Sequence, residues 1–391
     1  MNYDWSHAER DLFTAEHDAF RETVRRFYAS EIQPNVRRWE AQGIFDRDLF
    51  RRAGAAGLLC PGIPERYGGG GGDLLHHVIC YEEHGYSPAG ASIGEGFDTD
   101  TSSYMILAAG TEEQRSHWLP KYASGEVVAE GAFTEPQSGS DLGSIRTTAR
   151  RDGSHYVVNG SKTWITNATH LDMCLLVART SGEGAPPAFS LFLVDTHLPG
   201  VSKGAPLETL HRGCSNIGTL HFDEVRVPAE QLLGGREGLG VKHAAGALNI
   251  GRLALAARIV ASCELALRMT VDFVRERRAF GRSIFDFQHT QFQLTELKTR
   301  VEVSRAFVDR CLARALKGTL QPAEASMAKL WTSELQTRLL DTCVQLHGAT
   351  GLSHEHPLSQ MYTASRSHRI MMGTSEMQRL TDFWNDALHI L

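Results

Sequence analysis

The sequence lacks any run of 18 uncharged apolar residues, which is close to the minimum for a membrane-spanning helix. The best candidate, residues 253–267, is interrupted by Arg258 and Glu264. The first residues, MNYDWSHAERDLF, are polar and acidic, unlike a signal peptide or an arginine-rich transit peptide. We therefore expect no membrane span and no leader, and a cytoplasmic protein.

An excess of basic charge is also missing. The chain has 40 Lys and Arg against 46 Asp and Glu, a net charge of −6. Nucleic-acid binding needs a clustered basic face, so we expect no nucleic-acid partner. The seven cysteines are scattered, odd in number and without a CxxC pair. This pattern favours reduced thiols over a disulfide framework.

Two further sequence patterns, one of dinucleotide binding and one of metal binding, are incomplete. The glycine run from Gly68 to Gly72 follows no predicted strand and opens no βαβ unit, so a dinucleotide-binding Rossmann fold is not indicated. His354, Glu355 and His356 precede a proline in a predicted loop and have no third ligand at a useful spacing. We therefore expect no metal site.

Hydrophobic periodicity divides the chain into three zones and predicts an α+β multidomain protein. Residues 1–126 show helical spacing, residues 127–236 show period-two runs separated by hairpin glycines, and residues 237–391 are helical again. We expect an N-terminal helical domain, a middle antiparallel β-domain and a C-terminal helical bundle. The predicted bundle helices cover residues 240–277, 288–317, 322–348 and 358–388.

The strongest chemical signals lie in the middle zone. Residues 132–141 include two hydroxyls, Thr134 and Ser140, beside turn residues. Residues 160–167 contain Trp164 and Thr166, whose spacing predicts that they share one face of a strand. A flat aromatic side chain with nearby hydroxyls and backbone N–H groups suits a planar heterocycle such as an isoalloxazine ring. Either segment alone is more typical of a core tryptophan with turn hydroxyls.

Together with other segments, these motifs resemble the acyl-CoA dehydrogenase family of FAD flavoproteins. The resemblance runs over nearly the whole chain and keeps the order of the family's motifs. It is carried by residues 57–59, 64–69, 132–141, 160–167, 225–228, 277–281, 287–288, 345–351 and 373–376. It implies a helical domain, a β-domain and a four-helix bundle, assembled into a homotetramer or dimer of dimers, with FAD between the β-domain, the bundle and a neighbouring subunit.

The resemblance also assigns roles to individual residues. Those implied to hold FAD in the β-domain are Phe133, Thr134, Ser140, Trp164 and Thr166. Those implied to serve a neighbouring subunit's FAD or its adenosine side, or to close the site, are Arg277, Phe280, Gln288, Gln345, Gly348, Ala349, Thr374 and Glu376. Residues implied to line the substrate site are Ser140, Asn249, Arg252 and Met372. Ala349 stands where the family usually has a second glycine.

The resemblance breaks at the catalytic base. The family usually places a glutamate just before the Gly-Thr pair, where this chain has Met372. A minority branch places it before the arginine of the first bundle helix, where this chain has Gly251. Methionine and glycine side chains accept no proton. The base is therefore either absent or relocated.

Residues 94–100 offer acidic replacements. Glu95, Asp98 and Asp100 lie in a segment that, by the pattern of the family, borders the acyl pocket. They are candidates for a relocated base or for a counter-charge to a polar or cationic acyl group. The alternative is a solvated helix start, since Asp and Thr favour first turns.

The segment from His211 to Gly218 resembles the family's CoA-facing motif only at Ser215. Three functions therefore stay open. One is an FAD-dependent oxidoreductase acting on a polar or specialised acyl thioester of CoA or of an acyl carrier protein. Another is a flavin oxygenase or oxidase of the same fold that removes no Cα proton. The third is a non-catalytic subunit of a mixed oligomer. The electron acceptor is not indicated.

Overall fold

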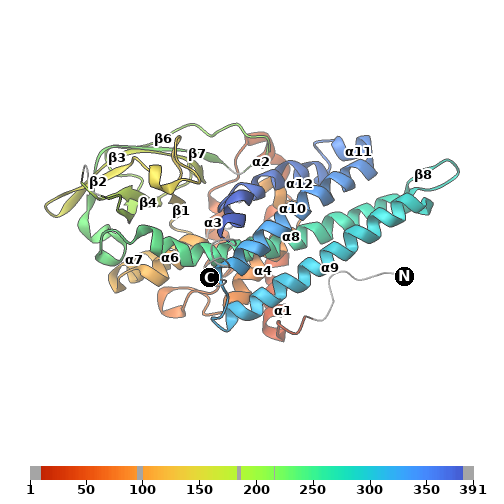
Figure 1. The fold of residues 1–391 in the computed structure, drawn as a ribbon, viewed down its shortest axis with the longest axis horizontal. Helices are drawn as coiled ribbons and strands as arrows, with labels where there is room; N and C mark the ends of the chain where they lie inside the picture. Colours follow the sequence, from red (N-terminus) through yellow and green to blue (C-terminus); the bar gives the residue numbers. More distant parts are fainter. Residues whose placement is uncertain (1–9, 95–99, 183–185, 215, 382–391) are drawn as a thin grey trace.

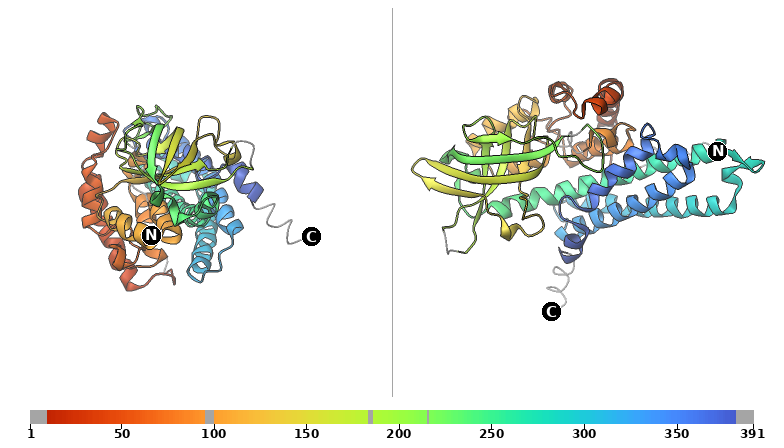
Figure 2. Two further views of the ribbon diagram at one scale, coloured as in Figure 1. Left: turned by 90° about the vertical axis from the view of Figure 1, so that its left-hand side faces the viewer. Right: turned by 90° about the horizontal axis from the view of Figure 1, so that it is seen from above.

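The computed structural model describes residues 10–94, 100–182, 186–214 and 216–381. Helices from both ends of the chain surround one long central helix, and a β-domain lies at one end (Figures 1 and 2). No helix within these ranges has both the length and the apolar character needed to cross a bilayer.

The N-terminal part is helical, as predicted. Thr111 caps the last of its helices, and its side chain accepts a hydrogen bond from the Gln114 N–H. The helices are α1 (Ala15–Phe27), α2 (Val36–Gln42), α3 (Asp48–Ala55), α4 (Leu74–Tyr86), α5 (Gly90–Ile93), α6 (Asp100–Ala109) and α7 (Glu112–Ala123), with a π-helical turn at Tyr28–Ile32.

The middle part is one sheet in which β4 pairs with three other strands. Most pairs are antiparallel, as predicted, but β4 runs parallel to β1 and, at one residue pair, to β2. The strands are β1 (Ala129–Ala132), β2 (Thr148–Asp152), β3 (His155–Thr166), β4 (Met173–Arg179), β5 (Phe189–Asp195), β6 (Val201–Lys203) and β7 (Ile217–Pro228).

The C-terminal part is built on α8 (Gly240–Glu276), which packs against α4 on one side and α9 and α10 on the other. A short hairpin of β8 (Arg278–Ala279) and β9 (Arg282–Ser283) connects α8 to α9. The remaining helices are α9 (Gln288–Leu316), α10 (Pro322–His347), α11 (Ala349–Leu352) and α12 (Pro357–Ser365), followed by a 3₁₀ turn at Arg366–Arg369.

The prediction of one helix over residues 358–388 is wrong. The helix α12 ends at Ser365, and Met372 and Gly373 have φ angles of 52° and 93°. Right-handed helices cannot contain consecutive residues with positive φ. A turn therefore replaces the middle of the predicted helix, and this turn carries Met372.

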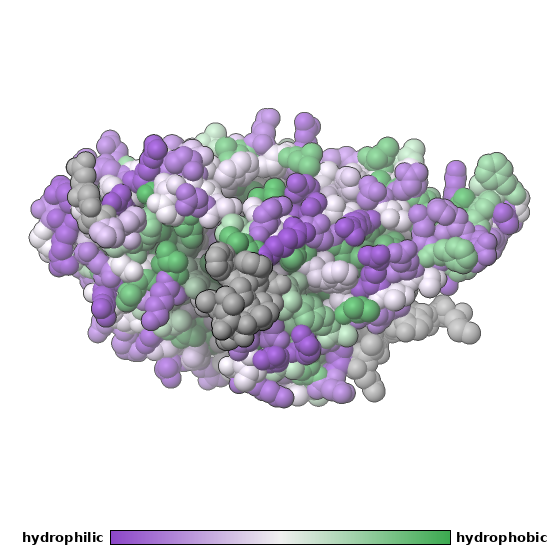
Figure 3. Space-filling view, viewed as in Figure 1, coloured by the Kyte–Doolittle hydropathy of each residue, from purple (hydrophilic) through white to green (hydrophobic). Residues whose placement is uncertain are grey.

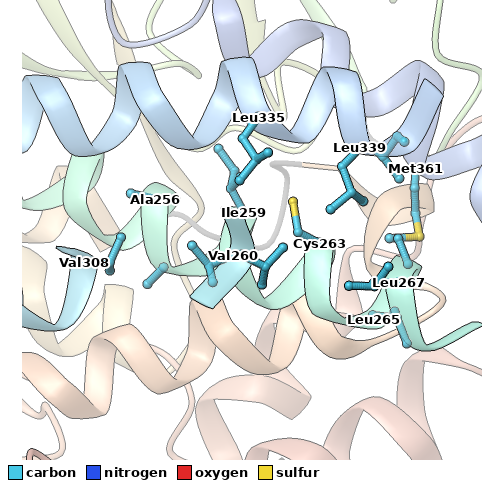
Figure 4. Close-up of a cluster of buried hydrophobic side chains, with 14 of the residues drawn as sticks. Ala256, Ile259, Val260, Cys263, Leu265, Leu267, Val308, Leu335, Leu339 and Met361 are labelled. Carbon is cyan, nitrogen blue, oxygen red and sulfur yellow. The ribbon is translucent and has the colours of Figure 1, made fainter. Parts of the chain in front are cut away.

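The core of the bundle explains the apolar run at 253–267. Figure 4 shows α8 side chains, among them Ile259 and Cys263, lying beside Leu335 and Leu339 of α10. A helix that is covered on nearly all sides has apolar residues on nearly all of its faces. Glu264, one of the two charges that interrupt the run, accepts hydrogen bonds from Arg305 of α9 and from Tyr86 of α4.

A buried ionic network joins the N-terminal helices to the bundle. Glu82 of α4 is fully buried and accepts hydrogen bonds from Arg10, Arg21 and Arg305 at 2.7 to 2.8 Å. Although burial raises the pKa of Glu82, the surrounding guanidinium groups lower it to about 2. The network fixes α4 against α1 and α9, and so fixes the position of the central helix.

Candidate active site

The segment after β1 is held in place by a buried ion pair. Lys162 Nζ of β3 donates to Glu135 Oε1 at 2.8 Å and to the Phe133 carbonyl at 2.9 Å. The two side chains are 0% and 2% exposed. Glu135 also accepts hydrogen bonds from the backbone N–H groups of Arg146 and Thr147. Burial raises the pKa of Glu135, but the hydrogen bond from Lys162 and those from the backbone lower it to about 2.

This arrangement presents Trp164 to the outside of the β-domain. The pairing of β3 with β7 is irregular between Lys162 and Ile165, and Trp164 adopts a φ of 60°. Its indole is 58% exposed, whereas Ile165 is buried. The Thr163 N–H donates to the Thr134 carbonyl at 2.9 Å, so the two predicted flavin-binding segments lie side by side. An exposed indole beside hydroxyls on a rigid support fits the ring of FAD.

A second cluster surrounds the turn at Met372. The Met372 carbonyl accepts hydrogen bonds from Arg252 Nε of α8 and from Gln378 Nε2, each at 3.0 Å. The Gly373 carbonyl accepts from Lys329 Nζ of α10 at 2.8 Å and from the same Gln378 amide at 3.0 Å. Three side-chain donors thus hold a backbone conformation that a methionine rarely adopts.

The two positions that lack a base converge in space. A Cβ atom added to Gly251 would lie 3.5 Å from Met372 Cε and 3.6 Å from Met372 Sδ. It would also lie 3.0 Å from the hydroxyl of Thr101 on α6. Side chains at 251 and 372 therefore enter the same volume, although the two positions are far apart in the sequence. Arg252 lies at the edge of this volume and donates to Asn249 Oδ1 at 3.3 Å.

This volume is electropositive. Lys329 is fully buried, and burial together with the charge of Arg252 lowers the pKa of Lys329 to about 8. Burial likewise lowers the pKa of Arg252. Glu334 and Glu376 favour the charged form of Lys329 and partly offset these effects, while Arg369 opposes it.

The other predicted cofactor residues lie elsewhere. Thr374 and Glu376 follow the Met372 turn. The hairpin of β8 and β9 and the short helix α11 lie together at the opposite end of the molecule from the β-domain (Figure 1). They carry or adjoin Arg277, Phe280, Gln288, Gln345, Gly348 and Ala349. Within one chain, the structure does not bring this group to Trp164.

The residues at the β8–β9 hairpin and α11 include a large apolar side chain that is exposed to solvent. Figure 3 shows apolar residues at the end of the molecule where the hairpin lies. Phe280 is 94% exposed and adopts a φ of 52°. Gly348 has a φ of 58° and a ψ of −140°, a conformation suited to glycine, and Ala349 begins α11. The implied role of these residues in a neighbouring subunit stays a prediction.

Several predicted residues are not described. Glu95, Asp98 and Ser215 lie outside the described residues, as does the side chain of Asp100. Sequence reasoning missed Lys329, Gln378, Thr101 and the pair of Lys162 with Glu135. Lys162 and Glu135 lie inside motifs that were recognised, but nothing in the local pattern of α10 distinguishes Lys329 from a solvent-facing lysine.

A separate cluster of His17, Asp73 and His76 joins the starts of α1 and α4. The ring atom Nδ1 of His17 accepts a hydrogen bond from the Thr14 N–H, and His76 Nδ1 accepts one from the Asp73 N–H. An imidazole that accepts at Nδ1 carries its proton on Nε2. His17 Nε2 then donates to Asp73 at 3.1 Å, so the cluster serves to cap two helices.

The chain thus combines an N-terminal helical part, a middle sheet with an exposed Trp164, and a C-terminal helical bundle. The chain matches the family models for the N-terminal, middle and C-terminal domains of acyl-CoA dehydrogenase at residues 14–126, 131–225 and 238–381. The rat long-chain specific acyl-CoA dehydrogenase, a mitochondrial protein, is 40% identical over 95% of this chain and 86% of its own length.

Solved structures agree. The acyl-CoA dehydrogenase from Geobacillus kaustophilus has a TM-score of 0.92 and 35% identity, over 95% of this chain and 98% of that one. The FAD complex of the acyl-CoA dehydrogenase from Bacillus anthracis has a TM-score of 0.87 and 30% identity, over 97% and 68%. The chain belongs to the acyl-CoA dehydrogenase family of FAD-dependent oxidoreductases, which confirms the predicted family, fold and cofactor class. The domain boundaries and individual site residues stay predictions.

Proposed function

We propose that this protein is an FAD-dependent dehydrogenase of a polar or specialised acyl thioester, and that its catalytic base is relocated. The observation that carries the proposal is the convergence of Met372 and Gly251 beside Arg252. Neither converging side chain accepts a proton, and removal of a Cα proton needs an acceptor within hydrogen-bond reach.

The cofactor would be held by the two groups of residues described above. Phe133, Thr134, Ser140, Trp164 and Thr166 would contact the flavin of the same chain. Arg277, Phe280, Gln288 and residues 345–349 would contact that of a neighbouring subunit, and a guanidinium at Arg277 suits a pyrophosphate. When bound, FAD supplies the acceptor for the hydride that leaves Cβ. The proposed assembly is a homotetramer.

The base would come from the segment just before α6. The residues on either side of this segment lie against α8. Arg258 Nη2 donates to the Gly94 carbonyl at 3.4 Å, and Thr101 adjoins Gly251. Glu95 and Asp98 lie between these two points in the sequence, which supports them as proton acceptors.

The proposed function also includes the carrier of the acyl group, which is either CoA or an acyl carrier protein. Arg212 and Cys214 precede Ser215, the one position that keeps the family's CoA-facing pattern. Cys214 is buried, and its thiol donates to the Ser92 carbonyl at 3.1 Å. A segment that contributes so few cationic or hydroxyl groups supports an acyl carrier protein as an alternative carrier to free CoA.

Two experiments test the proposal. The first compares turnover of matched CoA and carrier-protein thioesters. Equal or better use of CoA would remove the carrier protein from the proposal. The second measures turnover of Glu95→Gln and Asp98→Asn on the preferred thioester, with exposed Glu296→Gln as an acidic control away from the site. A loss of about 10²-fold or more in one of the first two variants is expected for a general base. Unchanged turnover in both would end the relocated-base hypothesis.

A further inference from the structure

The hydroxyl of Thr101 is buried and has no hydrogen-bond partner among the described residues. A hydroxyl carries one donor and two acceptor sites, and leaving them unused in the interior costs free energy. Buried polar groups without a protein partner are uncommon in folded proteins and call for a ligand or an ordered water. Thr101 lies in the first turn of α6, on the segment that reaches the substrate volume.

The position of this hydroxyl relates it to the reaction site. Thr101 Oγ1 lies 3.0 Å from the point that a Cβ on Gly251 would occupy. The same point is 3.5 Å from Met372 Cε. Because these distances are short, Thr101, Gly251 and Met372 lie close together, and a side chain larger than that of glycine at 251 would press on the Thr101 hydroxyl. The hydroxyl therefore faces the volume in which the two usual base positions meet.

The neighbouring polar groups are already engaged. Arg252 donates to the Met372 carbonyl and to Asn249, and Lys329 donates to the Gly373 carbonyl. The Gln378 amide nitrogen donates to both carbonyls. Each of these donors holds the backbone turn. None of them pairs with Thr101, so its partner must come from outside this set.

The charged side chains near Thr101 restrict the kind of chemical group that can pair with its hydroxyl. Arg252 and Lys329 make the volume electropositive, which disfavours a cationic substituent. A neutral hydroxyl group both donates and accepts, as Thr101 does, so it can use both kinds of hydrogen-bonding site that the Thr101 hydroxyl offers.

We propose that Thr101 determines substrate specificity by forming a hydrogen bond with a hydroxyl group on the acyl chain, so that the preferred substrate is a hydroxyacyl thioester. This inference rests on the proposed function and gives the polar acyl group a chemical class. The methionine and glycine at the usual base positions supply apolar surroundings, and Thr101 supplies the polar contact.

The test uses pairs of CoA thioesters in which a terminal hydroxyl on carbon 4, 5 or 6 replaces a methyl group of equal size. The FAD-loaded protein is first reduced with dithionite, so that no turnover occurs, and dissociation constants are measured by calorimetry. Wild type should prefer the hydroxyl member of at least one pair by about tenfold, the scale of one buried hydrogen bond. Thr101→Val, which has nearly the same shape, should lose that preference.

Thr101→Ser is the matched control, because it keeps the hydroxyl and should retain the preference. If wild type shows no preference in any pair, or if Thr101→Val keeps it, the inference is wrong. A parallel measurement on the oxidised protein separates this outcome from failure of the proposed function. Anaerobic bleaching of the flavin by any thioester supports dehydrogenation, whichever way the Thr101 variants behave.

Discussion

Replacing Met372 with glutamate should create the proton acceptor that this site lacks. Methionine and glutamate side chains extend by the same number of heavy atoms beyond Cα. A carboxylate oxygen at 372 would therefore take about the place of Met372 Cε. That atom lies 3.5 Å from the point that a Cβ on Gly251 would occupy. Arg252 and Gln378 hold the backbone of this turn through its carbonyl, so the substitution leaves the turn in place.

The expected gain follows from the worth of a general base. A positioned base contributes about 10² to 10⁴ in rate, which corresponds to roughly 3 to 5 kcal/mol. Arg252 lies beside the new carboxylate and favours its ionised form. We expect Met372→Glu to raise the rate of flavin reduction by a simple saturated acyl-CoA by about 10²-fold or more.

The assay is anaerobic stopped-flow measurement of flavin absorbance after mixing with the acyl-CoA. Met372→Gln has a similar shape but no proton acceptor, and it should show no gain. Both variants must retain FAD and melt cooperatively for the comparison to count. Equal rates for the glutamate and glutamine variants would refute the inference that a side chain at 372 reaches the site of proton removal.

Three further predictions concern charged groups that position the site. The folded-state pKa of Lys329, about 8, lies below its ordinary value of 10.5, so the folded protein releases this proton first. The free energy of unfolding should therefore rise between pH 8 and 10.5, and Lys329→Met should lack this rise in urea titrations. Glu82 has a lowered pKa of about 2 against 4.5, so its stabilisation is complete above pH 4.5 and declines as the pH falls towards 2. Glu82→Gln should cost about 3 to 5 kcal/mol at pH 7 by denaturant unfolding, with exposed Glu296→Gln near zero. Lys162→Met should leave Glu135 buried without its partner, which lowers the melting temperature and weakens FAD binding measured by flavin fluorescence. An unchanged FAD affinity in a folded Lys162→Met variant would show that the ion pair does not shape the flavin surface.

Much of the fold was predictable because local patterns agree with it. Thr111 signals its helix start by a capping side chain, and hairpin glycines separate the strands. The predicted helix through residues 358–388 failed for a physical reason. The turn at Met372 and Gly373 depends on donors from Arg252, Lys329 and Gln378, and the first two of these are distant in sequence.

The residues of the candidate site were predictable only where they belong to recognisable sequence motifs. Trp164 was identified from its motif, but its exposure follows from an irregularity in the pairing of β3 with β7. The encounter of Gly251 with Met372 required three-dimensional information. Thr101 was missed because its importance lies in a hydrogen bond that it does not make, and a sequence does not record such an absence.

The most direct test of the account is an anaerobic titration of the FAD-loaded protein with acyl thioesters, followed by flavin absorbance. The account predicts that at least one hydroxyacyl thioester bleaches the flavin and that the enoyl product appears in equal amount. If no thioester bleaches the flavin, while oxygen is consumed and incorporated into a product, the protein is an oxygenase of the same fold and the dehydrogenase proposal is wrong.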